Sequence, residues 1–122
     1  MTIRGIDHIN IGTPRLEETK RFFRDVLGLT EGWRPPFSFG GAWLYAGDTA
    51  VVHLVEIPAA KGPSADAALD HFAFRIDDLD GVVRRLDEAG IGYRLTDVPG
   101  SAARQVFVRD LNGVNIELNW RP

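Results

Sequence analysis

The sequence contains no cysteine and no long hydrophobic run, and each absence excludes a class of protein. Without cysteine there is no disulfide, no thiolate metal ligand and no cysteine nucleophile. No segment approaches the roughly 18 consecutive apolar residues that indicate a membrane-spanning helix. The amino terminus also lacks the basic and then apolar pattern of a secretory signal. We therefore expect a cytoplasmic protein with no membrane partner.

The sequence also lacks an excess of either charge. Its 14 basic and 17 acidic residues are mixed along 122 positions and give a net charge of −3, which argues against nucleic-acid binding. With 44% hydrophobic residues the chain can bury a core. Its length fits one domain, residues 1–122. Within it we expect a first module at about 1–58, a linker at about 59–68 and a second module at about 69–122.

The two expected modules share a repeated pattern. Asp7-His8-Ile9 returns 63 residues later as Asp70-His71-Phe72, and each motif precedes a segment with helical spacing. His53 follows the first motif's histidine by 45 residues, and Glu117 follows the second by 46. Each half therefore has one side chain that can bind a metal on its first strand and another on its last. A repeat of this kind indicates duplicated structural units.

Both halves predict a strand, a helix and three further strands. For the first half we expect strands at 3–11, 42–46 and 49–57, a helix at 16–26 and a short strand within 30–41. For the second half we expect strands at 69–76, 91–95, 105–109 and 114–120, with a helix between the first two. Thr13 is expected to cap the first helix, and Asp77 or Asp78 the second. Phe22 and Phe23 are expected in the core.

Alternation along the strands assigns polar and apolar side chains to opposite faces. In the last strand Val114, Ile116 and Leu118 alternate with Asn115, Glu117 and Asn119. Because helices cover the apolar face, the polar face is left for a concave site. The metal-capable side chains expected there are His8, His53, His71 and Glu117. In the alternative interpretation these groups only face solvent, on a sheet that has one face on the core and the other exposed to water.

Four further residues are candidates for substrate binding. Trp43 and Phe107 lie ten residues before His53 and Glu117, and can form cavity walls or simply pack in the core. Asn10 and Arg75 share the polar faces of the two first strands by parity.

The sequence resembles the vicinal oxygen chelate superfamily, which includes glyoxalase I, methylmalonyl-CoA epimerase, extradiol dioxygenases, fosfomycin-modifying enzymes and bleomycin-resistance proteins. The resemblance rests on four stretches, residues 7–9, 22–29, 70–74 and 110–118. In the last stretch Leu111 and Asn112 replace the proline and aspartate of the family pattern.

The resemblance implies an α+β fold in which two βαβββ modules form a half-open mixed β-barrel with helices outside. It implies that His8, His71 and Glu117 bind one divalent metal, Fe, Mn, Ni, Co or Zn. The fourth ligand position, usually glutamate in glyoxalases and glutamine in the epimerase, falls on His53. Glu117 is the candidate catalytic base. The resemblance further implies a homodimer, with modules paired within one chain or across two.

Three histidines and one glutamate would leave a divalent site with a formal charge of about +1, against about zero for a site with two glutamates. Such a site favours an anionic or enolisable oxygen substrate.

The preferred hypothesis is a lyase or isomerase that uses Glu117 as base. The alternatives are an Fe(II) dioxygenase, transfer of thiol or water to a small antibiotic, and a non-enzymatic protein of the bleomycin-resistance type. The last would hold a planar antibiotic between Trp43, Phe107 and the loop at 33–39.

Overall fold

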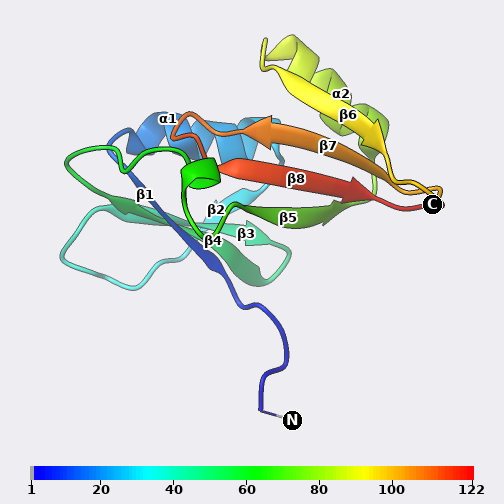
Figure 1. Cartoon of the computed structure of the whole chain (residues 1–122). Coiled ribbons are helices and arrows are strands. Elements are labelled where there is room, and N and C mark those ends of the chain that lie inside the picture. Colours follow the sequence, from blue (N-terminus) through cyan, green and yellow to red (C-terminus); the bar gives the residue numbers. More distant parts are fainter. Residues whose placement is uncertain (1) are drawn as a thin grey trace. The chain divides into compact units, whose positions relative to one another are not determined.

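A computed structural model describes residues 2–122, and its chain divides into two compact units, Met1–Lys61 and Gly62–Pro122 (Figure 1). Each unit contains one four-stranded mixed sheet. Within the described residues, no helix is long and apolar enough to cross a membrane.

The first unit has the element order strand, helix and three strands. Its elements are β1 (Ile9–Thr13), α1 (Leu16–Arg21) with a π-helical turn (Phe22–Val26), β2 (Thr30–Gly32), β3 (Gly41–Ala46) and β4 (Thr49–Glu56). The sheet order is β1-β4-β3-β2, and β1 runs parallel to β4 while the other pairs are antiparallel. The helix α1 packs on β3 and β4.

The second unit repeats this arrangement. A short 3-10 turn (Ser64–Asp66) is followed by β5 (His71–Ile76), α2 (Leu79–Glu88), β6 (Tyr93–Asp97), β7 (Arg104–Arg109) and β8 (Asn115–Trp120). The sheet order is β5-β8-β7-β6, again with the first and last strands parallel. Figure 1 shows α2 beside β6. The equivalent connectivity confirms the internal duplication and the predicted α+β fold of two βαβββ modules.

The core of each unit lies on the apolar face of its sheet, as the alternation predicts. In the second unit, Ile116 and Leu118 of β8 are buried, and so are Val106 and Val108 of β7. The helix α2 begins at the cap Asp78, whose carboxylate accepts a hydrogen bond of 2.9 Å from Gly81 N. Its buried side chains are Leu79, Val82 and Leu86. The opposite face of this sheet is therefore free to carry Glu117.

The first helix differs from the prediction of an unbroken α-helix over 16–26. After Arg21 the helix widens into a π-helical turn, in which Leu27 N bonds to Phe22 O at 3.1 Å. The wider turn lets the consecutive residues Phe22 and Phe23 both enter the core, 7% and 0% exposed. Their rings meet edge to face, with centroids 5.2 Å apart. The prediction that both rings are buried is confirmed.

Two predicted features of the first strand and helix are wrong. The strand predicted at 3–11 begins later in the structure. Gly5 bends the chain, and regular pairing begins only at Ile9, opposite Val52. His8 therefore lies just before β1. Thr13 does not cap α1, because it is the buried last residue of β1. Its hydroxyl accepts a hydrogen bond from Arg15 N and contacts the hydroxyl of Thr19, each at 3.0 Å.

Candidate functional site

In the first unit, one row across the sheet brings together Asn10, His53 and Trp43. In the strand register, Asn10 of β1 is directly opposite His53 of β4, and His53 is directly opposite (level with) Trp43 of β3. Residues level on neighbouring strands project from the same face. Two of the predicted substrate-binding residues therefore flank a predicted metal ligand on this face.

The ring of His53 is held between two other rings. It stacks on Trp43 with centroids 3.9 Å apart, and on His8 with centroids 3.7 Å apart and planes 11° from parallel. His53 is only 9% exposed, and burial lowers its pKa, with the nearby His8 adding to the effect. The imidazole is therefore neutral at pH 7. Because a metal lies in the plane of each imidazole that binds it, His8 and His53 could share one ion only if this stack opened.

Each histidine of the repeated Asp-His motif is hydrogen-bonded to the aspartate that precedes it. His8 Nδ1 lies 2.6 Å from the Asp7 carboxylate, and His71 Nδ1 lies 2.8 Å from the Asp70 carboxylate. A carboxylate accepts hydrogen bonds, so Nδ1 is the donor in each ring, and in the neutral form of the ring the lone pair is on Nε2. Histidines that bind metals usually donate the other ring N–H to a carboxylate in this manner. Each imidazole thus has the kind of hydrogen-bond partner that metal-binding histidines usually have.

The carboxylate of Glu117 is held by two side-chain amides. Gln105 donates a hydrogen bond of 2.6 Å to Oε1, and Asn119 donates one of 3.1 Å to Oε2. Phe107 of β7 is level with Glu117, and Ala73 of β5 is level with it on the other side. Glu117 is half-buried, so its position is fixed while part of it stays accessible.

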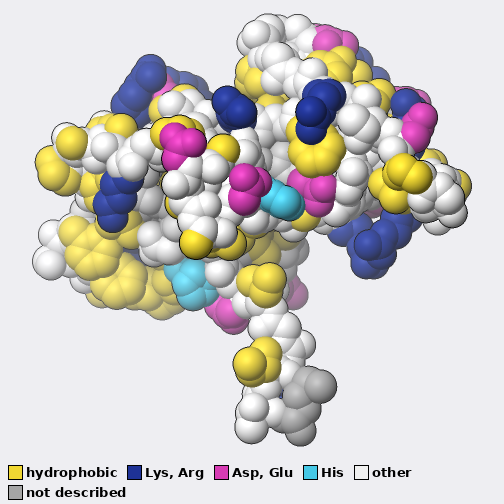
Figure 2. Space-filling view, viewed as in Figure 1, with side chains coloured by type: hydrophobic (Ala, Val, Ile, Leu, Met, Phe, Trp, Pro, Cys, Tyr) yellow, Lys and Arg dark blue, Asp and Glu magenta, His cyan; other side chains and the backbone are white. Residues whose placement is uncertain are grey.

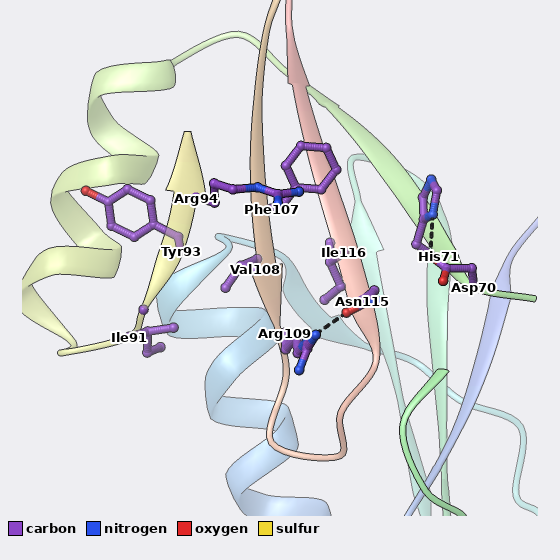
Figure 3. A pocket seen from close by; sticks show the side chains of 11 residues that line it. Asp70, His71, Ile91, Tyr93, Arg94, Phe107, Val108, Arg109, Asn115 and Ile116 are labelled. Carbon is purple, nitrogen blue, oxygen red and sulfur yellow. Dashed lines mark hydrogen bonds and ion pairs between the residues drawn. The ribbon is translucent and has the colours of Figure 1, made fainter. Parts of the chain in front are cut away.

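The other predicted residues of the second unit share this polar face. His71 is level with Asn115, and Arg75 is level with Asn119. His71 and Phe107 both line a pocket of about 590 Å³, whose residues are drawn in Figure 3. Arg75 is exposed and lies at the other end of β5, outside this pocket.

The predicted metal ligands are divided between the units. His8 and His53 belong to the first unit, and His71 and Glu117 to the second. Within residues 2–122, neither unit by itself gathers three histidine, aspartate or glutamate side chains that could hold one metal ion. A metal bound by the predicted set would need ligands from both modules.

Several polar residues at these sites were not predicted from the sequence. Gln105 and Asn119 hold Glu117 by hydrogen bonds. The sequence feature that could have identified them is strand alternation, which places them on the same face as Glu117. Asp7 and Asp70 orient the histidines, and their signal was repetition of the Asp-His pair. Arg94 had no recognisable signal, because its position depends on how β6 pairs with β7.

Comparison with known proteins identifies the fold family. The family model for the Glyoxalase/Bleomycin resistance protein/Dioxygenase superfamily matches residues 5–118, almost the whole chain. The chain belongs to this superfamily. The resemblance noted from the Asp-His repeat and the last hairpin is thereby confirmed, and so is the glyoxalase-like fold.

Individual members of the superfamily are similar over nearly the full chain. "Glyoxylase I 4" of Arabidopsis thaliana is 28% identical over 123 residues, which cover 95% of this chain and 70% of the plant protein. A protein assigned to the glyoxalase family from Bacillus anthracis superposes with a TM-score of 0.83 at 24% identity, covering 100% of this chain and 98% of the other. A variant of the fosfomycin resistance protein FosX from Listeria monocytogenes, solved with Mn(II) and 1S,2S-dihydroxypropylphosphonic acid, gives a TM-score of 0.78 at 17% identity, covering 99% and 95%. At such identities the two structures show the fold alone.

Proposed function

We propose that the chain is a divalent-metal-dependent enzyme that acts on a small oxygen-chelating substrate by lyase or isomerase chemistry. The proposed metal ligands are His8, His71 and Glu117. The observation that carries the proposal is the repeated Asp-His pair, because each unit holds one imidazole by Nδ1 and leaves Nε2 for a ligand. The Mn(II) present with the FosX variant supports the same class of cofactor.

The donor set fits a divalent transition metal. Two neutral imidazole nitrogens and one carboxylate oxygen suit Fe, Mn, Ni, Co or Zn. When bound, such a metal would supply Lewis-acid polarisation of a substrate oxygen. His53 would become a fourth ligand if its stack with His8 opened. While the stack is closed, the neutral ring of His53 and the indole of Trp43 form a flat wall.

Glu117 is the proposed general base. A carboxylate is suited to remove a proton from a carbon next to a polarised carbonyl, and later to return it. The hydrogen bonds from Gln105 and Asn119 fix both carboxylate oxygens before substrate arrives. A fixed base is more effective than a mobile one, since little ordering remains to be done in the transition state.

Antibiotic sequestration is a second candidate, supported by an aromatic surface on the first unit. Trp33, Phe37 and Phe39 are 70%, 45% and 47% exposed. Trp33 meets Trp43 edge to face, with ring centroids 6.0 Å apart. Figure 2 shows hydrophobic side chains gathered over the loop between β2 and β3. A planar ligand could stack here without any metal. An Fe(II) dioxygenase is a further alternative, and iron-dependent oxygen consumption would identify it.

Turnover of the methylglyoxal–glutathione hemithioacetal separates these functions. We expect little turnover by the native protein with Ni(II), Mn(II), Zn(II), Co(II) or Fe(II), because glyoxalases of this family place a second carboxylate where this chain has His53. His53→Glu should then weaken binding of an anionic ligand by lowering the charge of the site. Efficient native turnover with any of these metals would instead make the protein a glyoxalase I. Tight binding of a planar antibiotic by metal-free protein would favour sequestration.

We also propose that the protein is a homodimer, as the resemblance implies. Light scattering at micromolar concentration should give twice the 13.5 kDa of one chain. A mass of one chain would contradict this.

A further inference from the structure

Two arginines line the pocket at one end of the second sheet. The pocket lies where β5 and β8 begin, β7 ends and β6 begins (Figure 3). Arg94 comes from the edge strand β6, and Arg109 from its neighbour β7. Its volume of about 590 Å³ is in the range of pockets that bind small organic molecules. Ile91 and Phe107 supply an apolar part of the lining.

Neither guanidinium is neutralised by a carboxylate. Arg94 lies over the ring of Phe107, 4.7 Å from the centroid, and Arg109 donates a hydrogen bond of 2.9 Å to the neutral amide of Asn115. Among residues 2–122 these two arginines have no ion-pair partner, whereas Arg104 of the same sheet pairs with Asp97 at 2.9 Å. Asp70 is the acidic residue of the lining, and its carboxylate contacts His71. The lining therefore carries two guanidinium charges against one carboxylate.

The register connects these arginines to the proposed metal ligands. On the polar face, Arg109, Asn115 and His71 form one row across β7, β8 and β5. Arg94, Phe107 and Glu117 form the neighbouring row across β6, β7 and β8. Each arginine is thus two strands from a proposed ligand, a backbone separation of about 10 Å. Phe107 and Asn115 occupy the space between.

We propose that this pocket binds the anionic end of the substrate, a carboxylate or phosphate group carried on an apolar body. The planar forks of Arg94 and Arg109 match the paired oxygens of either group. The apolar body lies against Phe107, and the reacting oxygens lie about two strands away, beside His71 and Glu117. The inference rests on the proposed function, to which it adds a substrate class: small organic acids whose anionic group is several bonds from the chelating oxygens.

The test uses isotope-labelled, metal-free protein titrated with benzoate, phenyl phosphate and the uncharged benzyl alcohol. Amide NMR signals of Gly92, Arg94, Arg109 and Asn115 should shift with at least one anion. Benzyl alcohol should bind at least about tenfold more weakly, because it lacks the charge that the guanidiniums recognise. The tighter of the two anions identifies carboxylate or phosphate as the preferred group. Equal binding of benzyl alcohol and both anions would overturn the proposal.

Matched variants locate the binding on the two arginines. Arg94→Gln and Arg109→Gln should each weaken anion binding about tenfold. Arg84→Gln makes the same charge change on an exposed position of α2 outside the pocket, and should leave binding unchanged. Arg94→Lys keeps the charge but loses the planar fork, so it should still weaken binding and covers the case in which Arg94→Gln misfolds. An equal effect of Arg84→Gln would reduce the binding to general charge attraction and overturn the proposal.

The titration is independent of the proposed metal site. Anion binding without any metal binding would contradict the proposed enzyme while leaving the anion pocket intact. Metal binding without anion binding would contradict only the pocket.

Discussion

Gln105 of β7 donates a hydrogen bond of 2.6 Å to the Glu117 carboxylate of β8. The two residues are diagonal neighbours, since Gln105 is level with Asn119 and Phe107 is level with Glu117. Asn119 holds the other carboxylate oxygen, so Glu117 has one amide partner on its own strand and one on the next. The proposed metal ligand and base is therefore positioned by the pairing of the last hairpin.

Replacing Gln105 by alanine should weaken metal binding. The variant leaves Oε1 of Glu117 without its amide donor, and loss of a group that orients a metal ligand typically costs about 10–100-fold in affinity. Isothermal titration with Mn(II) or Ni(II) measures the change. Thr96→Ala is the matched control, because Thr96 is level with Gln105 on β6. Unchanged affinity in Gln105→Ala would show that this hydrogen bond does not support a metal site.

Asp70→Asn should also weaken metal binding by about 10–100-fold. An amide in place of the carboxylate holds the protonated Nδ1 of His71 less strongly, so the imidazole is less well oriented and less basic. Asp7→Asn should act in the same direction through His8. Asp66→Asn removes the same charge from an exposed turn and serves as the control in the same titration. An equal loss in the control would point to long-range charge instead of orientation.

Asp110 fixes the turn before β8, and its loss should destabilise the fold. Its carboxylate is 5% exposed and accepts hydrogen bonds of 2.9 Å from Asn112 N and Val114 N. Asp110→Ala leaves those donors without this acceptor, which should lower the free energy of unfolding by about 1–3 kcal/mol. Urea denaturation measures the change, with the exposed neighbour Leu111→Ala as control. Equal stability of both variants would contradict the importance of this turn.

Asp110 should also give a pH dependence of a definite sign. Burial raises the pKa of this carboxyl above its usual value, although hydrogen bonds from Val114 and Asn112 oppose the change. The unfolded chain then loses the proton at lower pH than the folded chain does. The free energy of unfolding should therefore fall as pH rises from the unfolded pKa to the folded pKa. Subtracting the urea-derived profile of Asp110→Asn from that of the native protein isolates this contribution. A difference that increases with pH in this window would contradict the direction.

Sequence patterns predicted the features that depend on periodicity and repetition. Strict alternation around Glu117 identified its face, and Asp-His repetition identified the duplication. The turn at Asn112-Gly113 is local as well, since Gly113 has a φ of 82° and Asp110 N bonds to Val114 O. These features are local, so the residues themselves specify them.

The remaining features depend on contacts that no local pattern encodes. The widened turn at Phe22 follows from the need to bury two consecutive aromatic rings. The stack of His8, His53 and Trp43 needs the pairing of three strand segments. Likewise, Arg94 meets Phe107 only through the register of β6 and β7.

The metal content of protein purified without chelator is the most direct test of the proposed site. Elemental analysis of the native protein should find a stoichiometric divalent transition metal. His71→Ala should lose it, because an alanine offers no nitrogen for the ion, while circular dichroism should show both proteins folded. A metal-free native protein that also binds none on reconstitution would contradict the proposal. So would a folded His71→Ala variant with the metal content of the native protein.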